Sequence, residues 1–137
     1  MNNQKPEVLF LCVHNAGRSQ MAAGFARRLG GDRIVVHSAG TAPGETLNPA
    51  VVEVMREKGI DISDQTPHEL TDAMGRSSDV IITMGCGDSC PVYPGKRYLD
   101  WELTDPAGKP LDEVRPIRDE IEQHVIALLD ELLSTTD

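Results

Sequence analysis

Residues 7–29 read EVLFLCVHNAGRSQMAAGFARRL, and this stretch decides the fold. Residues 7–13 form a short and almost continuous apolar run, which is typical of a central strand covered on both faces. Residues 14–19 are polar, and residues 20–29 have a helical composition. Two glycines follow directly and act as a helix stop signal. The segment therefore predicts a strand, a tight loop and a helix.

The remainder of the chain repeats this alternation. Apolar runs bounded by glycine, proline or polar residues predict three further strands. These runs are residues 34–40, 79–84 and 96–101. An Asn48-Pro49 cap opens a second helix, and two more helical patterns follow it. The three predicted helices are residues 48–59, 70–75 and 116–133. We expect the arginines on helix faces to be solvated, namely Arg27, Arg28, Arg115 and Arg118.

Strands that alternate with helices predict right-handed crossovers and an α/β fold. We expect a three-layer sandwich, in which a four-stranded parallel sheet has helices on both faces. The length of 137 residues suits a single domain over residues 1–137. Ligands of such sheets bind at the carboxyl ends of the strands. The loops after the first, third and fourth strands should therefore meet there, the last of them carrying Asp105.

The charge and the cysteine content limit the classes of function. The chain has 13 Lys and Arg against 22 Asp and Glu, a formal net charge of -9. This charge disfavours binding to nucleic acid and to anionic membranes. No apolar run approaches the ~18 residues that span a bilayer, and the start of the chain lacks a secretory pattern, so we expect a cytoplasmic protein. Three cysteines without a secretory signal argue against a static disulfide framework and point to thiol chemistry.

The loop at residues 12–19 has the pattern Cys-x5-Arg-Ser between a strand and a helix. Five intervening residues let backbone N–H groups point inward at the helix N-terminus and form an anion cradle. Cys12 would lie beneath a bound oxyanion as nucleophile, Arg18 would grip the oxyanion with its planar fork, and Ser19 would donate to the thiolate. The alternative is a buried core cysteine, but the surrounding context favours the cradle. The expected oxyanion-binding residues are Val13, His14, Asn15, Ala16, Gly17 and Arg18.

Asp105 admits two interpretations. Its carboxylic acid, placed over the cradle, would protonate an oxygen leaving the oxyanion. It is equally an ordinary turn residue, because Asp is common in turns and Pro106 follows it.

These motifs resemble the low-molecular-weight protein tyrosine phosphatases and the arsenate reductases built on the same fold. Residues 8–21 are similar to the phosphate loop of the family, residues 36–41 to its second strand, residues 47–49 and 59–63 to the segment that follows, and Asp105-Pro106 to its general-acid loop. The resemblance covers nearly the whole chain. Within the family, residues 19–22 and the later cysteines look like the arsenate reductase branch. The resemblance implies the phosphatase-like fold and the general-acid role of Asp105. We predict no cofactor and no metal, because Ala23 stands where some members have a glutamate that helps to hold a potassium ion.

Cys86 and Cys90 distinguish the arsenate reductase branch from the phosphatase branch. A phosphatase hydrolyses its phosphocysteine and needs no second thiol, whereas a reductase must dispose of two electrons. By resemblance, Cys86 would attack Cys12 after the arsenic adduct has formed, and Cys90 would then attack Cys86. A zinc site lacks further ligands at suitable spacing, and two incidental thiols are the other alternative.

The resemblance thus implies a cytoplasmic arsenate reductase with a Cys86/Cys90 relay reset by thioredoxin. Two other enzyme functions stay open: a reductase coupled to mycothiol and mycoredoxin, and a low-molecular-weight phosphatase. A third alternative is an oxyanion-binding or redox-sensing module without turnover. The expected ligand is arsenate or another tetrahedral oxyanion, with no nucleic acid or membrane partner.

Overall fold

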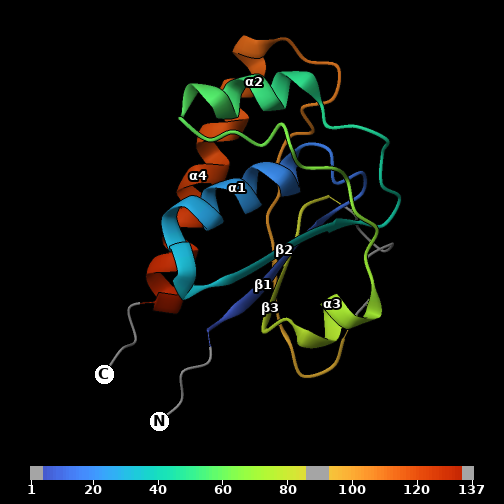
Figure 1. The fold of residues 1–137 in the computed structure, drawn as a ribbon, viewed down its shortest axis with the longest axis vertical. Coiled ribbons are helices and arrows are strands. Elements are labelled where there is room, and N and C mark those ends of the chain that lie inside the picture. The colour runs from blue at the N-terminus through green and yellow to red at the C-terminus, as the bar shows by residue number, and fades with distance from the viewer. Residues whose placement is uncertain (1–4, 86–92, 134–137) are drawn as a thin grey trace.

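The computed structural model describes residues 5–85 and 93–133, and Figure 1 shows its arrangement. Strands and helices alternate along most of the chain. In order they are β1 (Glu7–Cys12), α1 (Arg18–Gly30), the 3-10 helix η1 (Gly31–Arg33), β2 (Val35–Gly40), α2 (Pro49–Glu57), α3 (Asp72–Ser77), β3 (Val80–Thr83), β4 (Arg97–Asp100) and α4 (Leu111–Leu133). No helix within these ranges is long and apolar enough to cross a membrane.

The four strands form one parallel sheet in the order β2-β1-β3-β4, which confirms the predicted sheet. The registers align the carboxyl ends of the strands. Cys12 is level with Gly40 of β2, and Thr83 of β3 is level with Asp100 of β4. Because β1 is central, the loop that follows Cys12 lies between the ends of its two neighbours.

The sheet separates two apolar clusters, as expected for a three-layer sandwich (Figure 1). Alternate residues of β1 point to opposite faces. Val8, Phe10 and Cys12 belong to the larger cluster, which they share with α1, α2 and α4. Leu9 and Leu11 belong to the smaller cluster, against which residues around α3 pack. The run of apolar residues in β1 therefore reflects burial on both faces, as the sequence predicts.

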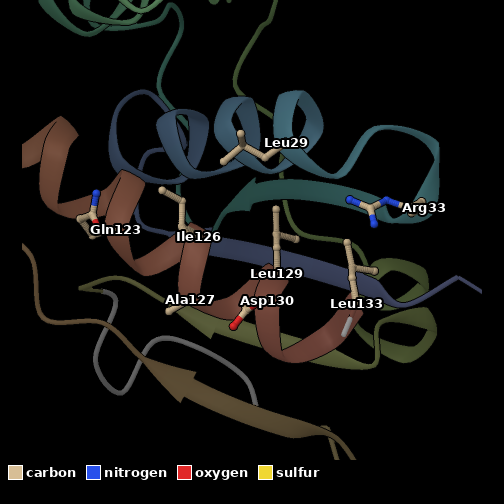
Figure 2. A pocket seen from close by; sticks show the side chains of 8 residues that line it. All are labelled: Leu29, Arg33, Gln123, Ile126, Ala127, Leu129, Asp130 and Leu133. Atoms are coloured by element: carbon tan, nitrogen blue, oxygen red, sulfur yellow. The ribbon is translucent and has the colours of Figure 1, made fainter. Parts of the chain in front are cut away.

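A groove lies between the C-terminal end of α1 and the C-terminal half of α4 (Figure 2). The groove has a volume of about 450 Å³. Leu29 and Ile126 line it, with 43% and 42% of their surfaces exposed. The groove contains none of the residues predicted to bind an oxyanion.

The start of α4 differs from the prediction. The sequence favoured a start near Pro116, because the apolar stripe that predicts this helix begins at Ile117. The structure starts the helix at Leu111 and leaves Pro116 inside it. The carbonyl of Pro110 accepts from the amides of Glu113 and Val114, at 3.0 and 3.1 Å. Of two prolines at this end, the earlier one marks the start of the helix.

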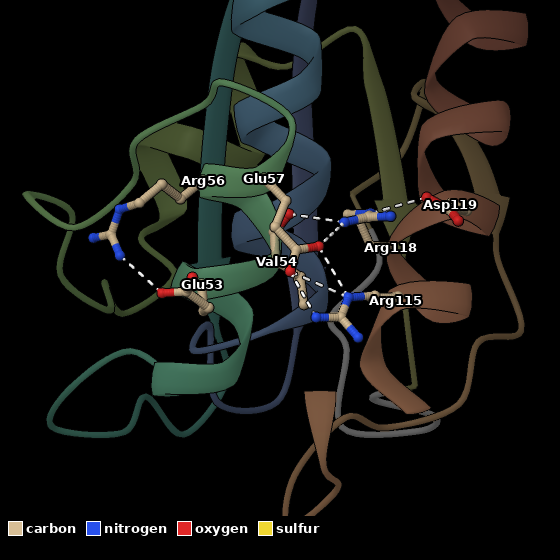
Figure 3. Close-up of polar contacts among 7 residues, drawn as sticks. All are labelled: Glu53, Val54, Arg56, Glu57, Arg115, Arg118 and Asp119. Carbon is tan, nitrogen blue, oxygen red and sulfur yellow. Dashed lines mark hydrogen bonds and ion pairs between the residues drawn. The ribbon is translucent and has the colours of Figure 1, made fainter. Parts of the chain in front are cut away.

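A second difference concerns Arg118, which is buried and not solvated (Figure 3). Its Nη1 donates to the carbonyl of Val54 at 3.0 Å and to Glu57 at 2.8 Å, and its Nε donates to Asp119 at 2.9 Å. Arg115 also binds Glu57 from α4. The prediction was wrong because two of the three partners, Val54 and Glu57, come from α2, and no local pattern in α4 reveals them. We call these residues (Val54, Glu57, Arg115, Arg118 and Asp119) the α2–α4 cluster.

Candidate active site

The loop between β1 and α1 turns its carbonyl groups toward residues 41–48. The carbonyls of Val13, His14 and Ala16 accept from the amides of Ala42, Gly44 and Asn48, at 2.8, 3.0 and 3.0 Å. In a trans peptide, the N–H of the next residue points opposite to the carbonyl. The amides that follow these three carbonyls therefore face the other side of the loop, where Cys12 lies. This is the orientation that an anion cradle requires.

Cys12 lies at the base of the loop with 2% of its surface exposed. Its Sγ is 2.9 Å from Ser19 Oγ and accepts from the amide of Asn15 at 3.3 Å. The hydroxyl of Ser19 and the amide of Asn15 therefore both lie against the sulfur at the base of the loop.

The proton on Ser19 can be assigned from its other contact. Asn15 Nδ2 donates to Ser19 Oγ at 2.7 Å. The orientation of this amide is fixed, because Asn15 Oδ1 accepts from the backbone N–H of His68 at 2.8 Å. Ser19 Oγ therefore accepts from Asn15, and its own proton is free to point at the sulfur of Cys12.

Asn15 adopts a positive φ of 51°, a conformation that asparagine tolerates better than most residues. Its side chain is fully buried, as is Gln20, whose Nε2 donates to Asn15 Oδ1 at 3.0 Å and to the carbonyl of Thr66 at 3.3 Å. The sequence did not single out Gln20. The sequence feature that could have indicated Gln20 is its place as a polar residue directly before the apolar positions of α1.

Arg18 is the first residue of α1 and is 9% exposed. Its Nη1 donates to the carbonyl of Leu103 at 3.3 Å, and its Nη2 lies 3.6 Å from Asp105 Oδ2. Asp105 is about half exposed and also accepts from the amide of Ala107 at 3.0 Å. The loop after β4 thus brings its carboxylate to the guanidinium at the mouth of the cradle.

A close approach holds this loop over the cradle. A Cβ on Gly17 would lie 3.0 Å from Cγ of Pro106, so the absence of a side chain at Gly17 lets Pro106 pack directly on the loop. Asn48 lies beside both. Its side chain caps α2 by accepting from the amide of Ala50 at 2.9 Å, and its Nδ2 lies 3.5 Å from the carbonyl of Pro106. The sequence identified Asn48 only as a cap.

These parts enclose a cavity of about 230 Å³, large enough for a small anion. Its size and its position at the carboxyl end of β1 distinguish it from the larger groove beside α4. The cavity is lined by Cys12, His14, Ala16, Gly17, Arg18, Gly44, Asn48, Asp105, Pro106 and Ala107.

Cys86 and Cys90 lie outside the described residues. The last described residue before them is Gly85, two residues after the end of β3 and close to Arg18. Within the described residues, Cys12 is a free cysteine.

Comparison with known proteins gives a consistent result. The family model described as low molecular weight phosphotyrosine protein phosphatase matches residues 7–136. "Arsenate reductase 2" of Staphylococcus epidermidis is 38% identical over 121 residues, which cover 85% of this chain and 91% of the relative. A "Glutaredoxin arsenate reductase" of Synechocystis is 36% identical over 126 residues, covering 90% and 95%.

The structure of a thioredoxin-dependent arsenate reductase of Corynebacterium glutamicum superimposes with a TM-score of 0.82 at 44% identity. The match covers 96% of this chain but 63% of the Corynebacterium chain, so the latter is considerably longer. The chain belongs to the low molecular weight phosphotyrosine protein phosphatase family, and within it to the group that contains the arsenate reductases.

Proposed function

We propose that this protein reduces arsenate to arsenite with Cys12 as its nucleophile. The observation that carries the proposal is that Cys12, Arg18 and Asp105 line one cavity of about 230 Å³. A thiol, an anion-binding guanidinium and a carboxylic acid are the groups that oxyanion chemistry on a cysteine requires. The arsenate reductases among the relatives favour arsenate over a phosphate ester as the substrate.

In the first step, arsenate binds to the inward amides of the loop and to the fork of Arg18. The thiolate of Cys12 then attacks arsenic, so that an arsenic–sulfur bond forms as an arsenic–oxygen bond breaks. Asp105 donates the proton with which the departing oxygen leaves as water. The position of Asp105, 3.6 Å from Arg18, supports this role.

In the second step, we propose that the thiolate of Cys86 attacks the sulfur of Cys12. A disulfide forms, the arsenic–sulfur bond breaks, and its electron pair stays on arsenic, which is released as arsenite. Cys90 then attacks Cys86, which frees Cys12 and leaves a Cys86–Cys90 disulfide. Two further cysteines in one short glycine-containing stretch of the sequence support this relay.

We propose a thioredoxin as the donor that reduces the final disulfide. The Corynebacterium relative, named as thioredoxin-dependent, supports this choice. The Synechocystis relative is named for glutaredoxin, so the donor differs among relatives and has to be tested directly.

The decisive experiment is arsenate-dependent oxidation of NADPH with thioredoxin and thioredoxin reductase, repeated with mycothiol and mycoredoxin. We expect turnover with thioredoxin and none for Cys12→Ser, because a serine hydroxyl stays protonated at neutral pH. Cys86→Ser should stop multiple turnover. Cys90→Ser should complete one turnover and trap a Cys12–Cys86 disulfide, which non-reducing peptide mapping detects.

Two outcomes would contradict parts of the proposal. Full activity of both Cys86→Ser and Cys90→Ser with mycothiol would replace the relay by an external thiol. Hydrolysis of p-nitrophenyl phosphate without any arsenate reduction would make the protein a phosphatase.

A further inference from the structure

Gly85 lies two residues after the end of β3, against the guanidinium of Arg18. A Cβ on Gly85 would be 2.5 Å from Nη1 of Arg18, 3.2 Å from its Cζ and 3.3 Å from its Nη2. Real Cβ atoms essentially never come as close as the first of these distances, so no other residue fits while Arg18 stays in place. Gly85 also has a φ of +91°, which side chains rarely adopt.

Few other contacts hold the guanidinium of Arg18 in place. Its Nη1 donates to the carbonyl of Leu103 at 3.3 Å, and its Nη2 lies 3.6 Å from Asp105, both longer than a strong charged hydrogen bond. Arginine has a long and flexible side chain, and bidentate binding needs its fork in one plane and one direction. The missing side chain of Gly85 leaves the space that the fork occupies in this position.

Gly85 does not line the cavity that contains Cys12, whereas Arg18 does. We therefore expect a substitution at Gly85 to affect a bound anion through Arg18. If a side chain were added at Gly85, the guanidinium would yield first, because it is the free end of a flexible side chain.

We infer that Gly85 is a positioning residue, which sets the fork of Arg18 for the oxyanion. The inference rests on the proposed function only in taking Arg18 as an anion ligand. The inference gives a part in anion binding to Gly85, which follows β3 and lies outside the Cys-x5-Arg motif. If the fork of Arg18 is correctly placed before binding, less conformational entropy is lost when the anion binds.

The test measures inorganic phosphate, so it does not depend on arsenate chemistry. The readout is the phosphate concentration that half-protects Cys12 from iodoacetamide, followed on the Cys12 peptide by mass spectrometry. Gly85→Ala should bind phosphate at least about tenfold more weakly, as expected for loss of one charged hydrogen bond. Gly85→Asn adds the same Cβ on a residue that tolerates positive φ, and it should show the same loss if Gly85→Ala folds poorly.

Gly95 provides the matched control. It has a similar φ of +80°, but a Cβ there would meet nothing within 4 Å. Gly95→Ala therefore introduces comparable backbone strain without touching Arg18. Its phosphate affinity should stay within about twofold of the parent.

A double-mutant cycle then separates positioning from a general structural effect. In an Arg18→Ala background, Gly85→Ala should weaken phosphate binding by less than about twofold, since no guanidinium is left to displace. Parental affinity in both Gly85 variants would overturn the inference. So would a loss that persists in the Arg18→Ala background, or an equal loss in Gly95→Ala.

The cycle also distinguishes this inference from the proposed function. Unchanged phosphate affinity in Arg18→Ala would refute the role of Arg18 and this inference together. Absence of arsenate reduction, with the expected phosphate results, would refute the proposed function alone.

Discussion

Arg118 and Arg18 are exposed to almost the same extent, 8% and 9%, but their surroundings differ. Arg118 has close partners for two of its three nitrogens, all at 2.8 to 3.0 Å. Arg18 has one carbonyl at 3.3 Å and one carboxylate at 3.6 Å, and it borders a cavity. Burying a cation without close partners costs free energy. A guanidinium that stabilises the fold therefore normally has hydrogen-bond partners within the protein.

The comparison shows how a structural arginine differs from one available for a ligand. The α2–α4 cluster binds two of the three nitrogens of Arg118 inside the protein (Figure 3). Beside the cradle formed by residues 12–19, N–H groups of Arg18 are available to a ligand at the mouth of the cavity. Burial alone does not separate the two roles, whereas the distances to their partners do.

The largest expected effect tests whether Asp105 acts in the chemical step and not in anion binding. Asp105→Asn should slow formation of the arsenic adduct by about 10²–10⁴-fold, because an amide cannot act as the general acid. Phosphate affinity should change little. Single-turnover kinetics measures the first quantity, and phosphate protection of Cys12 measures the second. A parental single-turnover rate would leave Asp105 as a turn residue.

Arg18→Lys should weaken phosphate binding by about 10–100-fold, as expected when a planar fork is replaced by a point charge and one charged hydrogen bond is lost. The midpoint of urea unfolding should stay near that of the parent, because Arg18 has only long contacts within the protein. An unchanged affinity with reduced stability would place Arg18 in the same class as Arg118.

Arg118→Lys is the matched substitution in the other region. We expect a loss of about 1–3 kcal/mol in the free energy of unfolding, since one ammonium cannot replace all the bonds and leaves a buried carbonyl unsatisfied. Phosphate affinity should equal that of the parent. Urea denaturation and the phosphate assay test both statements. Weaker phosphate binding in this variant would show that the two regions are coupled.

The smallest effect concerns the pH dependence of the α2–α4 cluster. Hydrogen bonds from Arg115, and also from Arg118, lower the pKa of Glu57 from 4.5 to about 2. A carboxylate with a lowered pKa stabilises the fold above its ordinary pKa and loses that contribution as the pH falls toward the lowered value. Glu57→Gln should therefore be less stable than the parent at neutral pH. The difference between their urea midpoints should shrink from about pH 5 toward pH 2, and a constant difference would contradict the assignment.

The sequence predicted the sheet, and most of its helices, because their signals are local. The apolar run of β1, the polar loop and the helix α1 follow one another, and the structure confirms them. The Asn48 cap also appears as predicted. The predicted start of α4 was wrong because the apolar stripe begins only at Ile117, whereas the helix already begins at Leu111.

Features made by distant residues could not be predicted. Glu57 meets Arg118 across 61 positions of the chain, so the burial of Arg118 depends on how α2 and α4 pack. The approach of Pro106 to Gly17 and of Arg18 to Gly85 likewise arises only after the sheet has formed. The sequence indicated that the loops meet, but it contained no information on which backbone atoms touch.

The burial of Cys12 limits which molecules can supply electrons to it. With 2% of its surface exposed at the bottom of a small cavity, the sulfur is accessible to a tetrahedral anion but not to the surface of another protein. Electrons from a macromolecular donor must therefore be carried inward by a group narrow enough to enter. That carrier is either a thiol side chain of this chain or a small diffusible thiol. The depth of the cavity thus makes the site selective for the size of its reductant as well as for the shape of its substrate.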